Sequence, residues 1–244
     1  SFAEWFIDEL KGLAIGIAVF GGTGLVALAY FAMRKSPNRW WIHLAIGSIP
    51  VVIIFSLLQP LVIDPMFNKF VPLKDQQLKS QILDLAAKAG IPSRNVYEVD
   101  KSKQTKKYNA YVSGWGTSQR IVLWDTTLQG METDEILFVM GHEMGHYRLW
   151  HIWKGIGFFS VLSFGLFFGS GLFMTWAVRR YGSRWGFTEL HDLASIPLFG
   201  IALSLVGLLA QPLTSSFTRI IEHDADTFAL EVTHLNDAGA GAFS

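Results

Sequence analysis

Four long apolar stretches alternate with polar segments along this chain. They cover residues 12–33, 40–63, 155–178 and 193–218; none of them contains Asp, Glu, Lys or Arg, and His43 is the only histidine within them. A helix needs about 20 mostly apolar residues to cross the hydrocarbon core of a bilayer. The glycines and prolines inside these stretches are tolerated in membrane helices, where neighbouring segments satisfy the backbone. The pattern therefore predicts four transmembrane helices.

Tryptophans support this prediction, because they gather at or near the ends of the four stretches, where an amphipathic ring favours the membrane interface. They are Trp5, Trp40, Trp41, Trp150, Trp153, Trp176 and Trp185. The alternative is four buried helices of a large soluble core. Uncharged runs of this length argue against that alternative.

The polar region between the second and third stretches carries shorter patterns. Helical spacing begins near Leu73 and is stopped by Gly90 and Pro92, and strands are expected at 95–99, 108–113 and 120–124. A further helix starts near Thr133, which is a suitable N-cap. We therefore expect a mainly α, polytopic membrane protein with a small α+β, zincin-like region between its second and third membrane helices.

Composition agrees with a membrane protein. Only 16% of the 244 residues are charged, against about a quarter in a typical soluble domain. The formal net charge is zero, so nothing indicates nucleic acid as a partner. The chain contains no cysteine, which excludes a disulfide framework, a cysteine nucleophile and a cysteine-ligated metal site.

The sequence His142-Glu143-Met144-Gly145-His146 is the candidate catalytic motif. Positions i and i+4 share one face of a helix, so His142 and His146 can bind one metal ion. Glu143 is then placed to accept a proton from a water molecule that the metal activates. The pattern predicts a metallopeptidase with one Zn²⁺ per chain.

A catalytic zinc needs a third protein ligand, and Glu222 is the candidate. Apolar spacing after Thr218 predicts a helix in which Glu222 and Asp226 lie on one face. The Asp226 carboxylate can then accept a hydrogen bond from the second ring nitrogen of a metal-bound histidine. His223 is a rival ligand, although it points about a quarter turn away from Glu222.

The strand that contains Asn109, Ala110 and Tyr111 is the candidate substrate-binding segment. An exposed strand edge can pair with an extended peptide and present its scissile bond. An ordinary strand inside a sheet is an equally good explanation of the same pattern.

These motifs together resemble the CAAX prenyl protease 1 family of integral-membrane zinc endopeptidases. The resemblance covers nearly the whole chain and rests on Arg39-Trp40-Trp41, Pro65-Met66-Phe67-Asn68-Lys69-Phe70, Asn109-Ala110-Tyr111, Ile121-Val122-Leu123-Trp124-Asp125-Thr126, the 142–146 motif and Arg219-Ile220-Ile221-Glu222-His223-Asp224-Ala225-Asp226.

The resemblance implies a ring of membrane helices around a water-filled chamber, with zinc held by His142, His146 and Glu222 at the chamber wall and Glu143 as the acid/base. It implies hydrolysis near a C-terminal prenylated cysteine, with Asn109 close to the substrate. The partners would be a peptide or prenylated protein and the lipid bilayer. The location would be a bacterial inner membrane or endoplasmic reticulum type, with the active site towards the cytosol.

On this basis residues 1–63 hold two membrane helices, 64–154 the catalytic region, 155–218 two more membrane helices, and 219–244 the helix with the third ligand. Family members have membrane helices before the point matching Ser1. They also have a segment after Ser244 with a His and an Arg near the active site. We therefore expect this chain to be a piece of a longer protein.

Two other functions fit the motifs. One is an HtpX-like membrane quality-control protease, which uses the same zinc arrangement. The other is a non-catalytic membrane scaffold with a structural zinc. A structural site would need four protein ligands and no base, whereas three ligands and Glu143 are found here.

Overall fold

The computed structural model describes residues 6, 9–13, 16, 22–58, 63–114 and 119–242. The chain divides into two compact units, each built from separate stretches. Unit 1 comprises Ser1–Ile54 and Ile156–Thr214, and unit 2 comprises Phe55–Gly155 and Ser215–Ser244. All of the candidate site residues belong to unit 2.

The regular secondary structure of unit 1 is helical in its described part, and turns join the helices. It contains α2 (Gly22–Lys35), most of α3 (Trp40–Leu58), most of α8 (His151–Trp185), the 3₁₀ turn η3 (Leu193–Ser195) and the first half of α9 (Ile196–Thr233). The side chain of Trp40 is 1% exposed and lies edge to face with Phe199, their ring centroids 5.7 Å apart. The ring of Trp40 thus packs between helices, and its expected position at a membrane interface stays a prediction.

Two segments in the described part of the chain are long and apolar enough to cross a membrane, His151–Trp185 and Leu193–Thr233. The apolar helix Trp40–Ile54 is shorter, and the expected stretch 12–33 lies partly outside the described residues. Large apolar side chains on the long helices are exposed, including Val161 and Leu209. Such a surface suits lipid better than water. The number of four membrane helices stays a prediction.

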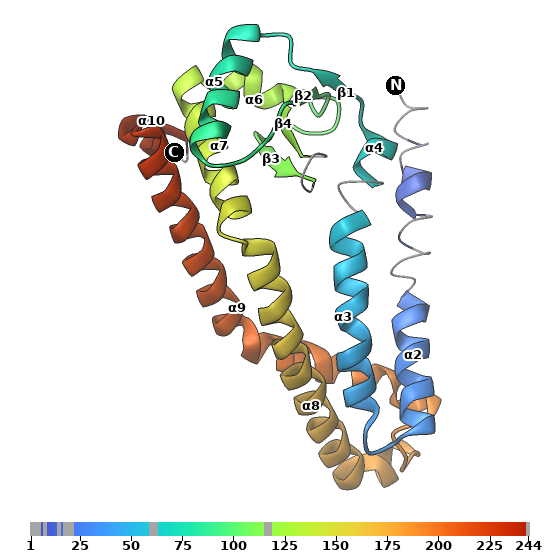
Figure 1. Ribbon diagram of the computed structural model, residues 1–244. Helices are drawn as coiled ribbons and strands as arrows, with labels where there is room; N and C mark the ends of the chain where they lie inside the picture. The colour runs from blue at the N-terminus through green and yellow to red at the C-terminus, as the bar shows by residue number, and fades with distance from the viewer. Residues whose placement is uncertain are drawn as a thin grey trace. The chain divides into compact units, whose positions relative to one another are not determined.

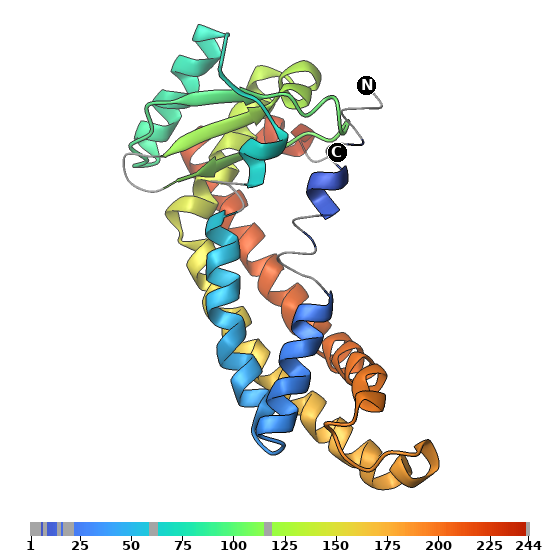
Figure 2. The ribbon, with the colours of Figure 1, turned by 90° about the vertical axis from the view of Figure 1, so that its right-hand side faces the viewer.

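Unit 2 is built around a four-stranded sheet in the order β1-β2-β4-β3 (Figures 1 and 2). The strands are β1 (Phe70–Pro72), β2 (Val96–Val99), β3 (Ala110–Ser113) and β4 (Arg120–Trp124). β2 and β4 run parallel, while β1 and β3 run antiparallel to their neighbours. The three expected strands are confirmed, and β1 is additional. β3 forms one edge of this sheet.

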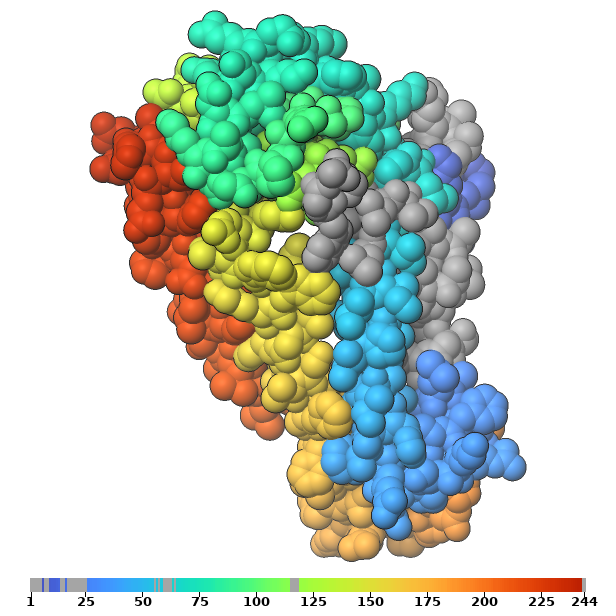
Figure 3. Space-filling model, in the orientation of Figure 1, coloured from blue at the N-terminus to red at the C-terminus, as the bar shows by residue number. Residues whose placement is uncertain are grey.

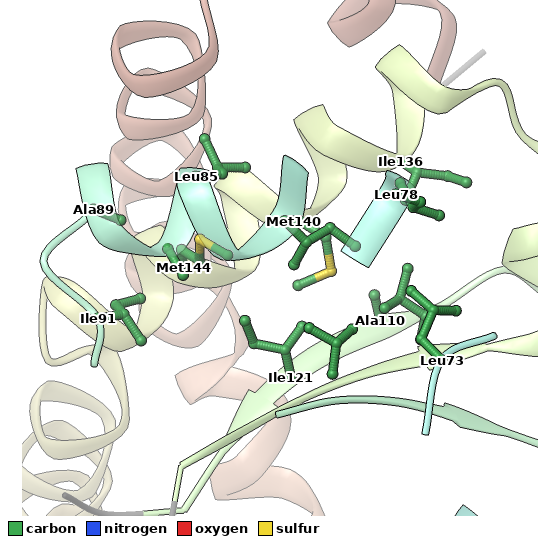
Figure 4. Packing of buried hydrophobic residues seen from close by; sticks show 14 residues of the cluster. Leu73, Leu78, Leu85, Ala89, Ile91, Ala110, Ile121, Ile136, Met140 and Met144 are labelled. Atoms are coloured by element: carbon green, nitrogen blue, oxygen red, sulfur yellow. The ribbon is translucent and has the colours of Figure 1, made fainter. Parts of the chain in front are cut away.

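Helices α5 (Gln76–Lys88) and α7 (Thr133–Arg148) cover one face of the sheet. Along β4, Ile121 and Leu123 point to this face by strand alternation, and both are completely buried. Met140 and Met144 of α7 fill the space between α5 and the sheet (Figure 4). Residues of α5 form part of the outer surface of unit 2 (Figure 3).

Capping residues set where the two helices begin. The carboxylate of Asp75 accepts hydrogen bonds from the backbone N–H groups of Gln77 and Leu78, so α5 starts after Leu73 rather than at it. The N-cap of α7 is Glu132, whose N–H donates to the Glu135 carboxylate. The expected N-cap at Thr133 is therefore wrong by one residue, because the acidic side chain of Glu135 folds back.

The remaining elements of unit 2 are short, apart from the second half of α9. They are α4 (Asp64–Phe67), α6 (Asp125–Gly130) and α10 (Asn236–Ala242), the last packed against α7. The fourth apolar stretch and the helix after Thr218 were expected as separate elements. They form the single helix α9, which continues through Pro212.

Candidate metal centre

Helix α7 presents His142 and His146 on one side because they are one helical turn apart. The opposite side of the same helix is anchored by Met140 and Met144, which are fully buried in the core. His142 is itself only 8% exposed. Core packing therefore fixes the rotation of α7 and with it the direction of both imidazole rings.

Glycines of α7 allow α9 to approach closely. A Cβ atom built on Gly145 would lie 3.2 Å from the backbone Cα of Ala225, and one on Gly141 would lie 2.9 Å from the Thr233 side chain. Because there is no side chain at these positions, the two helices meet almost backbone to backbone. This contact brings the α9 residue Glu222 next to the histidines.

The ligand atoms of the three residues form a compact triangle. His142 Nε2 lies 3.0 Å from His146 Nε2 and 3.3 Å from Glu222 Oε2. The distance from His146 Nε2 to Glu222 Oε2 is 3.6 Å. Ligands held tetrahedrally at 2.0–2.1 Å from a zinc ion would be about 3.3 Å apart. The donor set and its spacing therefore fit a zinc-sized ion.

The described residues offer one such group of three clustered metal-ligating side chains, and it is this one. His223 is not part of it, although it adjoins Glu222 on α9. Helical spacing turns the side chain of His223 by about 100° from that of Glu222.

Asp226 supports the first histidine. Its Oδ1 atom lies 2.8 Å from His142 Nδ1, which leaves the Nε2 atom of the ring facing Glu222 and His146. A ring that donates its Nδ1 hydrogen to a carboxylate keeps the Nε2 lone pair available to a metal. The expected pairing of Glu222 with Asp226 on one face of α9 is thus realised in the geometry.

Glu143 lines a cavity of about 450 Å³ beside the triangle. Burial, and secondly the negative charge of Glu222, raise the pKa of Glu143 to about 7. Near neutral pH this carboxyl group can both accept and release a proton. The cavity is lined by Val112, His142, Glu143, His146, Tyr147, His151, Ile152, Ile221 and Glu222.

The ring of His146 is neutral at neutral pH. Burial, followed by repulsion from His142, lowers the pKa of His146 to about 4. A neutral imidazole retains the lone pair with which histidine binds a metal. The electrostatic environment therefore favours the ligand form of this side chain.

The three expected substrate-binding residues do not line the cavity. Asn109 is exposed just before β3, and its side chain accepts a hydrogen bond from the N–H of Ala110. Ala110 is buried against the core, and Tyr111 points to the other face of the sheet. The residue of β3 that reaches the cavity is Val112, which sequence reasoning had not singled out. Alternation along the strand could have identified it.

His151 is a second residue that sequence reasoning missed. It was expected at a membrane interface, yet it lines the cavity and its Nδ1 atom lies 2.9 Å from the Nδ1 atom of His146. Between His146 and His151, α7 ends and α8 begins, and Trp150 at this junction has a left-handed backbone with φ of 61°. The helical spacing of α7 therefore does not extend to His151.

Comparison with known proteins shows which family this chain resembles. Residues 72–243 match the model of peptidase family M48, and residues 1–69 match the CAAX prenyl protease N-terminal model, described as five membrane helices. The crystal structure of S. mikatae Ste24p superposes with a TM-score of 0.77 at 27% identity, over 99% of this chain and 61% of that one.

Two curated relatives illustrate the similarity. An uncharacterized metalloprotease of Bacillus subtilis, YhfN, is 36% identical over 99% of this chain and 56% of its own length. CAAX prenyl protease 1 of Saccharomyces cerevisiae is 31% identical over 92% of this chain and 52% of its own. The chain thus spans about half the length of these relatives. With most of its length matched by the family model, the chain belongs to peptidase family M48.

Proposed function

We propose that this chain carries the catalytic centre of a zinc-dependent membrane endopeptidase. The observation that supports the proposal is the triangle of His142, His146 and Glu222, whose edges of 3.0, 3.3 and 3.6 Å suit one tetrahedral ion. The membership of family M48 supports a peptidase reaction.

Zinc is the proposed metal because two imidazole nitrogens and one carboxylate oxygen are a donor set of known catalytic zinc sites. Bound zinc would polarise the scissile carbonyl group and make a water molecule acidic enough to react near neutral pH. His142, His146 and Glu222 would hold it, and Asp226 would keep the ring of His142 in the binding orientation.

Glu143 is the proposed acid/base. Its carboxylate takes the proton of the attacking water and delivers it to the amine that leaves when the peptide bond breaks. The partly buried position of Glu143 supports this role, since a pKa of about 7 lets one group serve both steps.

The edge of β3 is the proposed binding site for the peptide. The carbonyl oxygen of Asn109 accepts a hydrogen bond from the backbone N–H of Trp124 in β4. In an antiparallel pair, residues alternate between bonding the neighbouring strand and facing away from it. The N–H and C=O groups of Ala110 and Val112 therefore point to the outer edge of β3. A peptide added there as an extended strand would pass beside the cavity that Val112 lines. Asn109 would fix the start of this edge, and Tyr111 would face the opposite side of the sheet.

The proposed substrate is a protein with a prenylated C-terminal cysteine, and the proposed setting is a lipid bilayer with the active site towards the cytosol. Support comes from relatives named CAAX prenyl protease 1 and from the membrane-helix family model over residues 1–69. The long exposed apolar helices suit lipid contact.

The decisive experiment measures zinc in the purified protein and cleavage of a prenylated peptide and its unprenylated counterpart. Wild-type protein should hold one zinc per chain and cut the prenylated peptide alone. Glu143→Gln should keep the zinc and lose about 10²–10⁴-fold in rate. Equal cutting of both peptides would favour a quality-control protease. Bound zinc without cleavage in any variant would favour a scaffold.

A further inference from the structure

His151 is buried against the metal centre although it lies outside the ligand triangle. It begins α8, is 4% exposed, and its Nδ1 atom lies 2.9 Å from His146 Nδ1. The two rings meet edge to face, with centroids 5.0 Å apart. This contact is nearly as close as the 2.8 Å between Asp226 Oδ1 and His142 Nδ1.

Hydrogen-bond chemistry fixes the role of each nitrogen in this contact. His146 directs Nε2 towards His142 and Glu222, so metal binding through Nε2 requires the ring hydrogen on Nδ1. That hydrogen then points at His151 Nδ1, which must act as the acceptor. The hydrogen of His151 is consequently on its Nε2 atom.

The Nε2 side of the His151 ring faces the carboxylate of Asp224. Its Nε2 atom is buried and has no hydrogen-bond partner within the described residues, and Asp224 Oδ2 lies 4.0 Å away. A negative charge at this distance favours the tautomer with the hydrogen on Nε2. Asp224 and Glu222 are neighbours on α9, so the same helix supplies a ligand and the charge behind His151.

We propose that His151 is a positioning residue that holds His146 in its metal-binding orientation, and that the negative charge of Asp224 favours the His151 tautomer that can accept from His146. The proposal rests on the proposed zinc site. It gives each ligand histidine its own support: Asp226 accepts from His142, and His151 accepts from His146. His151 is not a fourth ligand, because its Nδ1 atom faces the side of His146 that points away from the triangle.

A pair of substitutions separates positioning from simple packing. In His151→Asn the amide oxygen can replace the ring Nδ1 as acceptor, although the side chain is smaller. In His151→Phe the ring volume is kept and the acceptor is lost. His223→Phe is the matched control, because His223 is exposed and lies outside the ligand triangle.

The readout is the zinc dissociation constant of each full-length variant in detergent, measured by competition with a chelator. Visible absorption of the cobalt-loaded protein reports ligand geometry independently of activity. His151→Phe should bind zinc about 10- to 100-fold more weakly and change the cobalt spectrum, as loss of a partner behind a ligand histidine does. His151→Asn should recover most of the affinity, and His223→Phe should match the wild type.

Two results would overturn the inference. Wild-type affinity and spectrum in His151→Phe would show that His146 needs no acceptor. Weaker binding in His151→Asn than in His151→Phe would show that His151 only fills space. Failure of the wild-type protein to bind zinc would instead refute the proposed function, and this inference with it. Thermal unfolding of the metal-free variants identifies any that fail to fold.

Discussion

His142 Nδ1 and Asp226 Oδ1 lie 2.8 Å apart although 84 positions separate the two residues in the sequence. The contact joins α7 to α9 directly behind the candidate metal centre. It orients one ligand histidine and helps to hold together the two helices that supply all three ligands.

Replacement of Asp226 should weaken metal binding without abolishing the fold. Asp226→Ala removes the acceptor behind His142, and we expect zinc affinity to fall about 10- to 100-fold. Asp226→Asn keeps an acceptor oxygen and should lose less. Chelator competition measures both, with Asp84→Ala on the exposed side of α5 as control. Equal affinity in Asp226→Ala and the control would contradict the orienting role.

Glu222 and His223 can be compared as rival ligands. The oxygen of Glu222 is within 3.3 Å of His142 Nε2, whereas His223 is outside the ligand cluster. We expect Glu222→Ala to lose most of its bound zinc and His223→Ala to retain it, as measured by metal analysis after dialysis. The reverse result would move the third ligand to His223.

Gly145 should tolerate only very small side chains. A Cβ atom there already sits 3.2 Å from backbone atoms of Ala225, so Gly145→Leu must push α9 away from α7. Overpacking of this kind costs about 1–3 kcal/mol in the free energy of unfolding and should also separate Glu222 from the histidines. Gly130→Leu is no suitable control, because Tyr108 crowds that position too. Gly157→Leu is suitable, since nothing lies within 4 Å of a Cβ atom there.

Asp125 should make the stability of unit 2 depend on acid pH. Burial, the largest influence, raises the pKa of Asp125, but hydrogen bonds from Ser102, Lys101 and Thr126 outweigh it and lower the pKa below its ordinary value. Because the folded pKa is lower than the unfolded one, its stabilisation is present above about pH 3.9 and is lost as the pH falls through the folded value.

Thermal unfolding in detergent at neutral pH and near pH 3 tests this expectation. Wild-type protein should lose more stability on acidification than Asp125→Asn, which cannot ionise. An identical acid response in both proteins would assign the loss to other carboxyl groups.

Local patterns explain what could be predicted from the sequence. The spacing of His142 and His146 fixes their shared face because a helix repeats every 3.6 residues, and the helix itself is confirmed. The strands at 96–99 and 120–124 followed from short runs of β-branched residues. In these cases neighbours in the chain determine the structure.

Long-range packing explains what could not be predicted. Glu222 was predicted as the third ligand from its chemistry, but the helix contact that brings it to α7 runs through Gly145 and Ala225, which carry no pattern that links them. β1 has three residues, too few for periodicity, and forms by pairing with β2. His151 was expected at a membrane interface. Its contact with His146 depends on the left-handed turn at Trp150, which the apolar pattern does not indicate. Such features arise from tertiary contacts.

The missing side chain at Gly145 also bears on how well the centre fits a metal ion. It sets the spacing between α7 and α9, and that spacing sets the distance from the Glu222 carboxylate to the two imidazoles. A methyl group at this position would widen the triangle by a fraction of an ångström. We therefore expect Gly145→Ala to hold the Glu222 carboxylate farther from the two imidazoles and to fit a zinc-sized ion less well than the wild-type site does.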